Sequence, residues 1–110
     1  RKGAERGCAV AMNALGLLHE NGGVGEPDAA EAVRWYRRAV ELGYGPAMNN
    51  LGNCHADGRG VKKSSAEALA LYHRAAERGD GDAMYNLSNV YLNGEGVAKD
   101  EREAFRWVKR

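Results

Sequence analysis

The chain has 110 residues, of which 16 are basic and 15 are acidic, and its net charge is +1 at pH 7. This length is typical of one domain, and the balanced charge excludes a nucleic-acid binder that depends on bulk positive charge. With 44% hydrophobic and 28% charged residues, the composition is that of a globular protein rather than a disordered or membrane-spanning one.

The sequence repeats itself with a period of 36 residues. The positions that keep this register include Ala11, Ala47 and Ala83; Leu15, Leu51 and Leu87; and Gly22, Gly58 and Gly94. A fixed period of this length is typical of repeat architectures. We therefore predict one repeat domain over residues 1–110, with the tail of a preceding repeat at 1–7, repeats at 8–43 and 44–79, and a truncated repeat at 80–110.

Each repeat is predicted to contain two helices. The first helices span about 9–20, 45–56 and 81–92, and each ends at an Asn-Gly or Asp-Gly pair, where glycine can adopt the left-handed conformation. The second helices begin after Asp28, Ser64 and Asp100, and a glutamate follows each of these caps three residues later. That spacing is a capping box. Gly43 and Gly79 are predicted to end the second helices.

Apolar residues at helical spacing predict which faces are buried. Gly16 and Gly52 are expected to let a neighbouring helix approach closely. The predicted stripes are Ala11, Leu15 and Leu18 on the first helix, and Ala32, Trp35, Tyr36 and Ala39 on the second. Because one helical hairpin cannot bury its own apolar face, we predict an all-α solenoid of stacked antiparallel hairpins.

These motifs resemble a known family. The pattern is Ala-x-x-x-Leu-Gly at 47–52, Gly-x-Gly-Val at 58–61 and Glu-Ala-x-x-Trp-Tyr-x-x-Ala at 31–39. It is similar to the Sel-one-like repeat, a branch of the tetratricopeptide superfamily, over nearly the whole chain. The sequence departs from the pattern in its first loop and at Ser88. The resemblance implies a right-handed α-solenoid that acts as an adaptor and holds other proteins in complexes.

No residue pattern indicates catalysis, a metal or a cofactor. Cys54 falls on a core position, His19 and His55 are expected to fill gaps between helices, and His73 is predicted on a solvated face. A disulfide between Cys8 and Cys54 is not expected, and reduced thiols weakly favour a cytoplasmic setting. The Gly-x-Gly loops are predicted to end helices rather than to bind phosphates, because no strand precedes them. We therefore predict a non-enzymatic protein.

The candidate binding surface is the groove that first helices line in tetratricopeptide-like solenoids. Its predicted residues are Asn13, Leu17, Asn49, Asn50, Asn53, Tyr85, Asn86 and Asn89. An asparagine amide both donates and accepts hydrogen bonds, so it can pair with a peptide bond of a protein or peptide partner. Asn53 and Asn86 are expected to do so without being needed by the fold. Alternatively, these asparagines are only solvent-facing polar residues.

Basic residues form a stripe on the second helices: Arg34, Arg37, Arg38, Arg74, Arg106 and Lys109. This stripe is either a solvated convex face or, as an alternative function, a docking surface for RNA. The first helices offer no Lys or Arg to a nucleic acid, which disfavours RNA in the groove. Phe105 and Trp107 are expected to face an open end, so we predict a piece of a longer array that associates end to end. No apolar run predicts membrane insertion.

Overall fold

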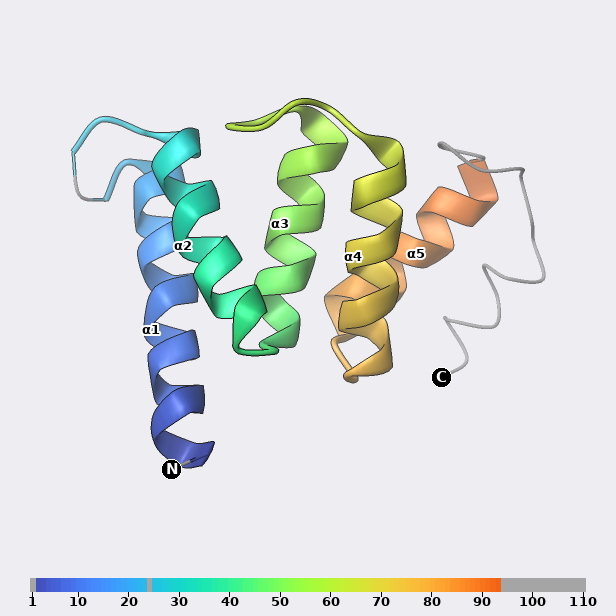
Figure 1. Ribbon diagram of the computed structural model, residues 1–110. Helices are drawn as coiled ribbons and strands as arrows, with labels where there is room; N and C mark the ends of the chain where they lie inside the picture. Colours follow the sequence, from blue (N-terminus) through green and yellow to red (C-terminus); the bar gives the residue numbers. More distant parts are fainter. Residues whose placement is uncertain (1, 24, 94–110) are drawn as a thin grey trace.

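The computed structural model describes residues 2–23 and 25–93, and these residues form five helices and no strand (Figure 1). The helices are α1 (Lys2–Asn21), α2 (Ala29–Glu41), α3 (Gly45–Asp57), α4 (Ser65–Glu77) and α5 (Gly81–Asn93). The α1–α2 and α3–α4 pairs are hairpins, and α2 and α4 also pack against the helix that follows each of them. This arrangement confirms the predicted α-solenoid of helical hairpins.

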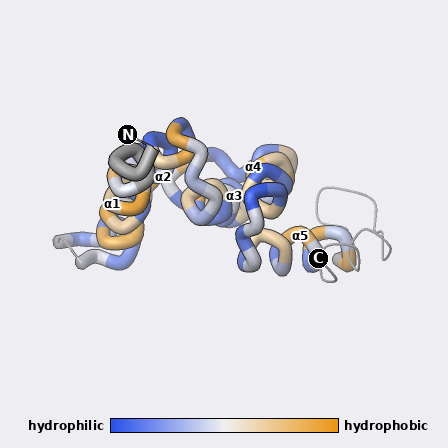
Figure 2. The backbone as a smooth tube through the Cα atoms, turned by 90° about the horizontal axis from the view of Figure 1, so that it is seen from below, coloured by the Kyte–Doolittle hydropathy of each residue, from blue (hydrophilic) through white to orange (hydrophobic). Residues whose placement is uncertain are grey.

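The solenoid places alternate helices on opposite sides of the row of hairpins. Seen from below, α2 and α4 lie on one side, whereas α1 and α5 lie on the other (Figure 2). First and second helices therefore present separate surfaces. The predicted groove belongs to the side of the first helices, and the predicted basic stripe belongs to the side of the second.

The starts of the helices follow the predicted caps. The Asp28 carboxylate accepts a hydrogen bond from the Glu31 backbone N–H at 3.1 Å, and the Ser64 hydroxyl accepts one from the Glu67 N–H at 3.2 Å. The Glu31 carboxylate does not complete the capping box in return, because it accepts a hydrogen bond from Arg34. The predicted cap at 100 lies outside the described residues.

The start of α5 has a cap that the sequence analysis missed. The Asp80 carboxylate accepts a hydrogen bond from the Ala83 backbone N–H at 3.0 Å. Burial raises the pKa of Asp80 above its ordinary value, although the hydrogen bond from Ala83 opposes this shift. The corresponding position before α3 holds Tyr44, whose side chain makes no capping bond. Because only one repeat has this cap, the comparison of repeats gave no signal for it.

Helix α1 is longer than predicted. It runs from Lys2 to Asn21 as one helix, whereas the sequence analysis began this helix at about residue 9 and assigned 1–7 to the tail of a preceding repeat. The counterparts of Gly7 have left-handed backbones, with φ +80° at Gly43 and +89° at Gly79. At those glycines the chain turns so that the next helix packs back on the previous one. No described helix precedes α1, so nothing requires a turn at Gly7.

The apolar stripe predicted for the first helix is buried in α3 but not in α1. Leu51 and Cys54 in α3 are 5% and 0% exposed. In α1, Ala11 is exposed, Leu15 is half-buried and Leu18 is 42% exposed. The prediction is therefore wrong for α1. The physical reason is that α2 covers this face of α3, whereas no helix of the described chain covers it on α1.

Glycine allows each described hairpin to close tightly, as predicted. A Cβ atom at Gly16 would lie 2.5 Å from the Tyr36 ring, and one at Gly52 would lie 2.7 Å from the Tyr72 ring. Both distances are shorter than any van der Waals contact, so a larger residue would displace the ring. On the second helix, the predicted stripe is confirmed for Ala32, Tyr36 and Ala39, which are buried, and Trp35 is half-buried.

Candidate functional site: an asparagine groove

The asparagines of the predicted groove hydrogen-bond to one another across repeats. The Asn50 amide nitrogen donates to the Asn13 Oδ1 atom at 2.9 Å, and the Asn86 amide nitrogen donates to the Asn49 Oδ1 atom at 2.8 Å. In both pairs the donor follows the acceptor by 37 positions, which is one repeat plus one residue. We call these two bonds the asparagine ladder. They link first helices of neighbouring repeats.

The two acceptors of the ladder are buried rather than open to a ligand. Asn13 and Asn49 are 9% and 6% exposed, whereas the donors Asn50 and Asn86 are partly exposed. A buried amide is costly unless it is hydrogen-bonded. The ladder satisfies the buried carbonyl groups, so it has a structural role in addition to any role in binding.

Asn53 ties three helices together. Its Oδ1 atom accepts from the Tyr72 hydroxyl at 2.6 Å and from the Asn86 amide nitrogen at 3.3 Å. These bonds join α3 to α4 and α5. Both side chains therefore bridge helices of the fold, and the expectation that the fold does not need Asn53 and Asn86 stays a prediction. Their placement on one surface allows these contacts.

A cavity of about 560 Å³ opens beside the ladder, between the α3–α4 hairpin and α5. Three predicted groove residues line it: Asn53, Asn86 and Asn89. The Asn53 amide nitrogen, the Asn86 carbonyl oxygen and both ends of the Asn89 amide have no hydrogen-bond partner among the described residues. The cavity therefore presents both donors and acceptors on one wall.

Other predicted groove residues lie outside this cavity. Leu17 on α1 is 39% exposed and Tyr85 on α5 is 66% exposed, so both side chains are accessible on the first helices. Neither lines the cavity. The structure thus gathers three of the eight predicted residues around one cavity, and it uses Asn13, Asn49 and Asn50 within the ladder.

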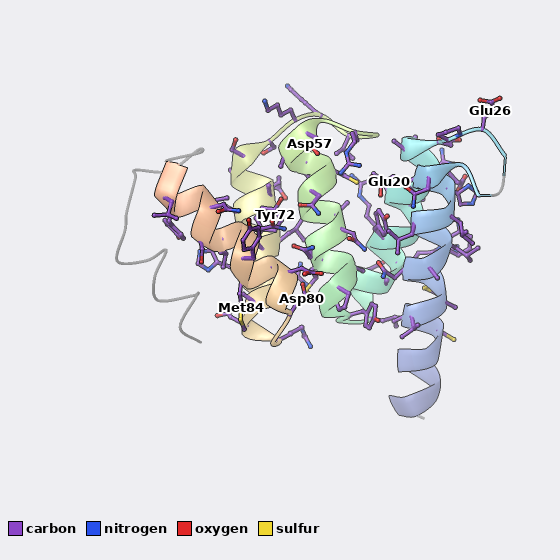
Figure 3. The ribbon with its side chains drawn as sticks, turned by 180° about the vertical axis from the view of Figure 1, so that it is seen from behind. Glu20, Glu26, Asp57, Tyr72, Asp80 and Met84 are labelled. Carbon is purple, nitrogen blue, oxygen red and sulfur yellow. The ribbon has the colours of Figure 1, made fainter. Side chains whose placement is uncertain are left out.

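A partly buried cluster around Glu20, which Figure 3 labels, joins the first hairpin to the second. The Glu20 carboxylate accepts hydrogen bonds from the Tyr36 hydroxyl at 2.6 Å and from Arg59, and the Cys54 thiol lies 3.9 Å away. Burial, reinforced by the negative charge of Glu20, raises the pKa of Cys54 to about 11 and raises the pKa of Tyr36 well above its ordinary value. The sequence analysis missed this cluster, because Ala56 holds the position of Glu20 in the next repeat.

The basic stripe is exposed, and half of its described arginines already have partners. The Arg34 guanidinium lies 3.1 Å from the Glu31 carboxylate, and the Arg38 guanidinium lies over the Trp35 ring at 5.1 Å. Arg37 and Arg74 are exposed too. The predicted stripe residues Arg106 and Lys109 lie outside the described residues, as do Phe105 and Trp107.

The sequence analysis predicted His73 on a solvated face, and this prediction is wrong. His73 is half-buried, and its Nε2 atom lies 2.8 Å from the Tyr91 hydroxyl, because α5 packs against α4 and brings the two rings together. Both cysteines are free, with Cys8 exposed and Cys54 buried. Within residues 2–23 and 25–93, no three metal-ligating side chains cluster. None of the described helices is long and apolar enough to cross a membrane.

The family of the chain follows from comparison with known proteins. The family model described as "Sel1 repeat" matches residues 9–44, 45–80 and 81–110. The chain belongs to the Sel1 repeat family. This finding confirms the resemblance to the Sel-one-like repeat. Sel1 repeats typically act as protein–protein interaction modules and are generally non-catalytic scaffolds.

Two solved Sel1 repeat structures are similar to this chain. A Sel1 repeat protein from Oxalobacter formigenes is 33% identical, with a TM-score of 0.86 over 92% of this chain and 42% of its own. The c5321 protein, a protective antigen present in uropathogenic Escherichia coli strains that displays an SLR fold, is 36% identical. Its TM-score is 0.88 over 96% of this chain and 23% of its own. This chain thus spans less than half of either protein. A search of curated proteins finds no match.

The Gly-x-Gly loop of the second Sel1 repeat packs on the repeat before it. Gly58 ends α3 in the left-handed conformation, with φ +70°. A Cβ atom at Gly60 would lie 2.4 Å from the Ala29 carbonyl oxygen at the start of α2. The second glycine of this motif therefore permits contact between backbones of neighbouring Sel1 repeats, and the prediction that the loop ends a helix is confirmed.

Proposed function

We propose that this Sel1 repeat chain is a non-enzymatic scaffold that binds an extended segment of a protein partner along α1, α3 and α5. The cavity beside the asparagine ladder carries the proposal. A peptide bond offers one acceptor and one donor. The Asn53 amide nitrogen and the Asn86 carbonyl oxygen supply the complementary pair, and neither atom has a partner among the described residues.

The ladder supports this proposal because it fixes the amides before a partner arrives. The hydrogen bonds of Asn53 to Tyr72 and Asn86 hold both side chains in one orientation. A side chain that is already ordered loses less entropy on binding, so more of its interaction energy contributes to affinity. The proposed contact residues are Leu17, Asn50, Asn53, Tyr85, Asn86 and Asn89, and the buried Asn13 and Asn49 act by holding the ladder.

The test uses Asn89, because it lines the cavity and makes no hydrogen bond within the described protein. A partner is first isolated by affinity capture, and its binding segment is titrated by calorimetry. Loss of one amide contact in Asn89→Ala should weaken binding about threefold to tenfold. The matched control is Arg74→Ala, an exposed change on the opposite side of the solenoid, which should leave affinity unchanged.

The reverse result would contradict the proposal that the partner binds in the groove. If Arg74→Ala weakens binding and Asn89→Ala does not, the partner binds the convex side. A steep fall in affinity with salt, typical of phosphate neutralisation, would then indicate the alternative RNA-binding function.

We further infer that copies of the chain associate through the exposed face of α1. On the apolar stripe of α1, Leu18 is 42% exposed, Ala11 is exposed and Leu15 is half-buried. The α3 and α5 counterparts of Leu18 are Cys54 and Val90, and both are buried against a second helix. In an associated pair, a helix of another copy would cover Leu18 as a second helix covers Cys54 and Val90.

A further inference from the structure

A second cavity of about 560 Å³ lies on another part of the molecule, between α2, the α3–α4 loop and the start of α4. It shares only Lys63 with the cavity beside the ladder. Its lining consists of Arg37, His55, Gly60, Val61, Lys62, Lys63, Ser64 and Glu67. The proposed scaffold function uses none of these residues.

Positive charges converge on this cavity. Arg37 comes from α2, whereas Lys62 and Lys63 come from the loop, and together they face one carboxylate, that of Glu67. None of the three cations forms an ion pair with a described residue. Like charges gathered in one concave site repel one another, and a bound anion relieves that repulsion.

The loop that carries the two lysines is held in place. Because the Gly60 backbone contacts that of Ala29, Lys62 and Lys63 project from a segment fixed against the preceding repeat. Fixed donors recognise an anion better than flexible ones, since less order must be imposed on binding.

We propose that this cavity binds a phosphate group. A phosphate dianion offers oxygens in several directions, which suits an arginine from α2 and two lysines from the α3–α4 loop. The phosphate comes either from a free small molecule or from a phosphorylated serine on a protein partner. Both sources present the same group to the site.

The experiment follows backbone amide resonances while inorganic phosphate is added at constant ionic strength. We expect the largest shifts at the loop residues that line the cavity, Val61, Lys62, Lys63 and Ser64. Lys62→Gln removes one charge-assisted hydrogen bond and should weaken binding about tenfold. Arg74→Gln removes the same charge from an exposed position outside the cavity and should change affinity less than about twofold. Melting curves of both variants check that the fold is retained.

A second arm distinguishes the two sources. A short peptide with phosphoserine is compared with its serine form and with inorganic phosphate. Tighter binding of the phosphopeptide than of phosphate indicates a phosphorylated partner, and equal binding indicates a small molecule. The proposal is overturned if phosphate causes no more shift than chloride at equal ionic strength. It is also overturned if Arg74→Gln weakens binding as much as Lys62→Gln. Phosphate would then be attracted by the positive charge of the whole convex surface and not by this cavity.

Discussion

Two first helices with the same sequence pattern have different surroundings. In α3, Leu51 and Cys54 are buried between α2 and α4. In α1, Leu15 is half-buried and Leu18 is 42% exposed, although each stands 36 positions before its α3 counterpart. The comparison teaches that this stripe is a surface between repeats. Its contribution to stability depends on whether a second helix lies against it, not on the residues of the stripe alone.

The largest expected effect comes from removing the same leucine in both helices. Leu51→Ala should lower the free energy of unfolding by about 2–5 kcal/mol, because it opens a cavity in the core. Leu15→Ala should cost about 1 kcal/mol, because solvent already reaches that side chain. Urea unfolding followed by circular dichroism measures both values. Equal losses would mean that the face of α1 is as well covered as that of α3.

A thiol at position 18 or 54 compares the two faces directly, in a Cys8→Ser background. The buried Cys54 has a pKa of about 11, against an ordinary value of 9.0. Its thiolate fraction near neutral pH is therefore about a hundredfold lower than that of an ordinary thiol, and its labelling should be slower by at least this factor than that of Leu18→Cys. The rates are measured with a disulfide reagent, using Leu18→Cys in a chain that also carries Cys54→Ala.

Labelling of Leu18→Cys also tests self-association. If copies meet through the face of α1, the labelling rate should fall as protein concentration rises, because the partner covers the thiol. A rate that is the same at all concentrations would contradict association through this face. Fast labelling of Cys54 in the native protein would contradict the buried stripe in α3.

The smallest effects are expected at two glycines that occupy the same position of the repeat. Gly7 lies inside α1, and a Cβ atom there would meet nothing within 4 Å, so Gly7→Ala should stabilise the protein by about 0.5–1 kcal/mol. Gly79 has φ +89°, so Gly79→Ala should destabilise it by about 1–2 kcal/mol. Thermal unfolding measures both changes. A loss of stability in Gly7→Ala would indicate a turn at that residue.

The sequence was sufficient to predict the hairpins, because the signals for them are local. Asp28 and Ser64 cap helices through N–H groups three residues away, and Gly58 ends α3 through its own backbone conformation. Contacts of this kind do not depend on how the repeats are placed. The close approach of Gly52 to Tyr72 also recurs with the period, so the alignment of repeats indicated it.

The candidate site was predicted only as a set of positions. The sequence placed Asn49, Asn53 and Asn86 on the first helices, but it could not show that their amides bond to one another. The ladder joins residues 37 positions apart, one more than the period, so a comparison of equivalent positions does not reveal it. The Glu20 cluster was missed for a related reason. Its members come from three helices and the α3–α4 loop, and no other repeat has a glutamate at that position.

The extra residue in the spacing of the ladder has a mechanical consequence. The side-chain hydrogen bond from Asn86 reaches Asn49, which is one residue before Asn50, the counterpart of Asn86 in the preceding repeat. This bond therefore resists axial sliding of one hairpin along the next. The curvature of a solenoid is the sum of small offsets between neighbours. Leucines and alanines tolerate such sliding because their contacts have no fixed direction, whereas a hydrogen bond does not. The hydrogen bonds of the ladder thus fix the offset between neighbouring repeats, and with it the pitch of the superhelix, whereas the apolar core supplies most of the stability.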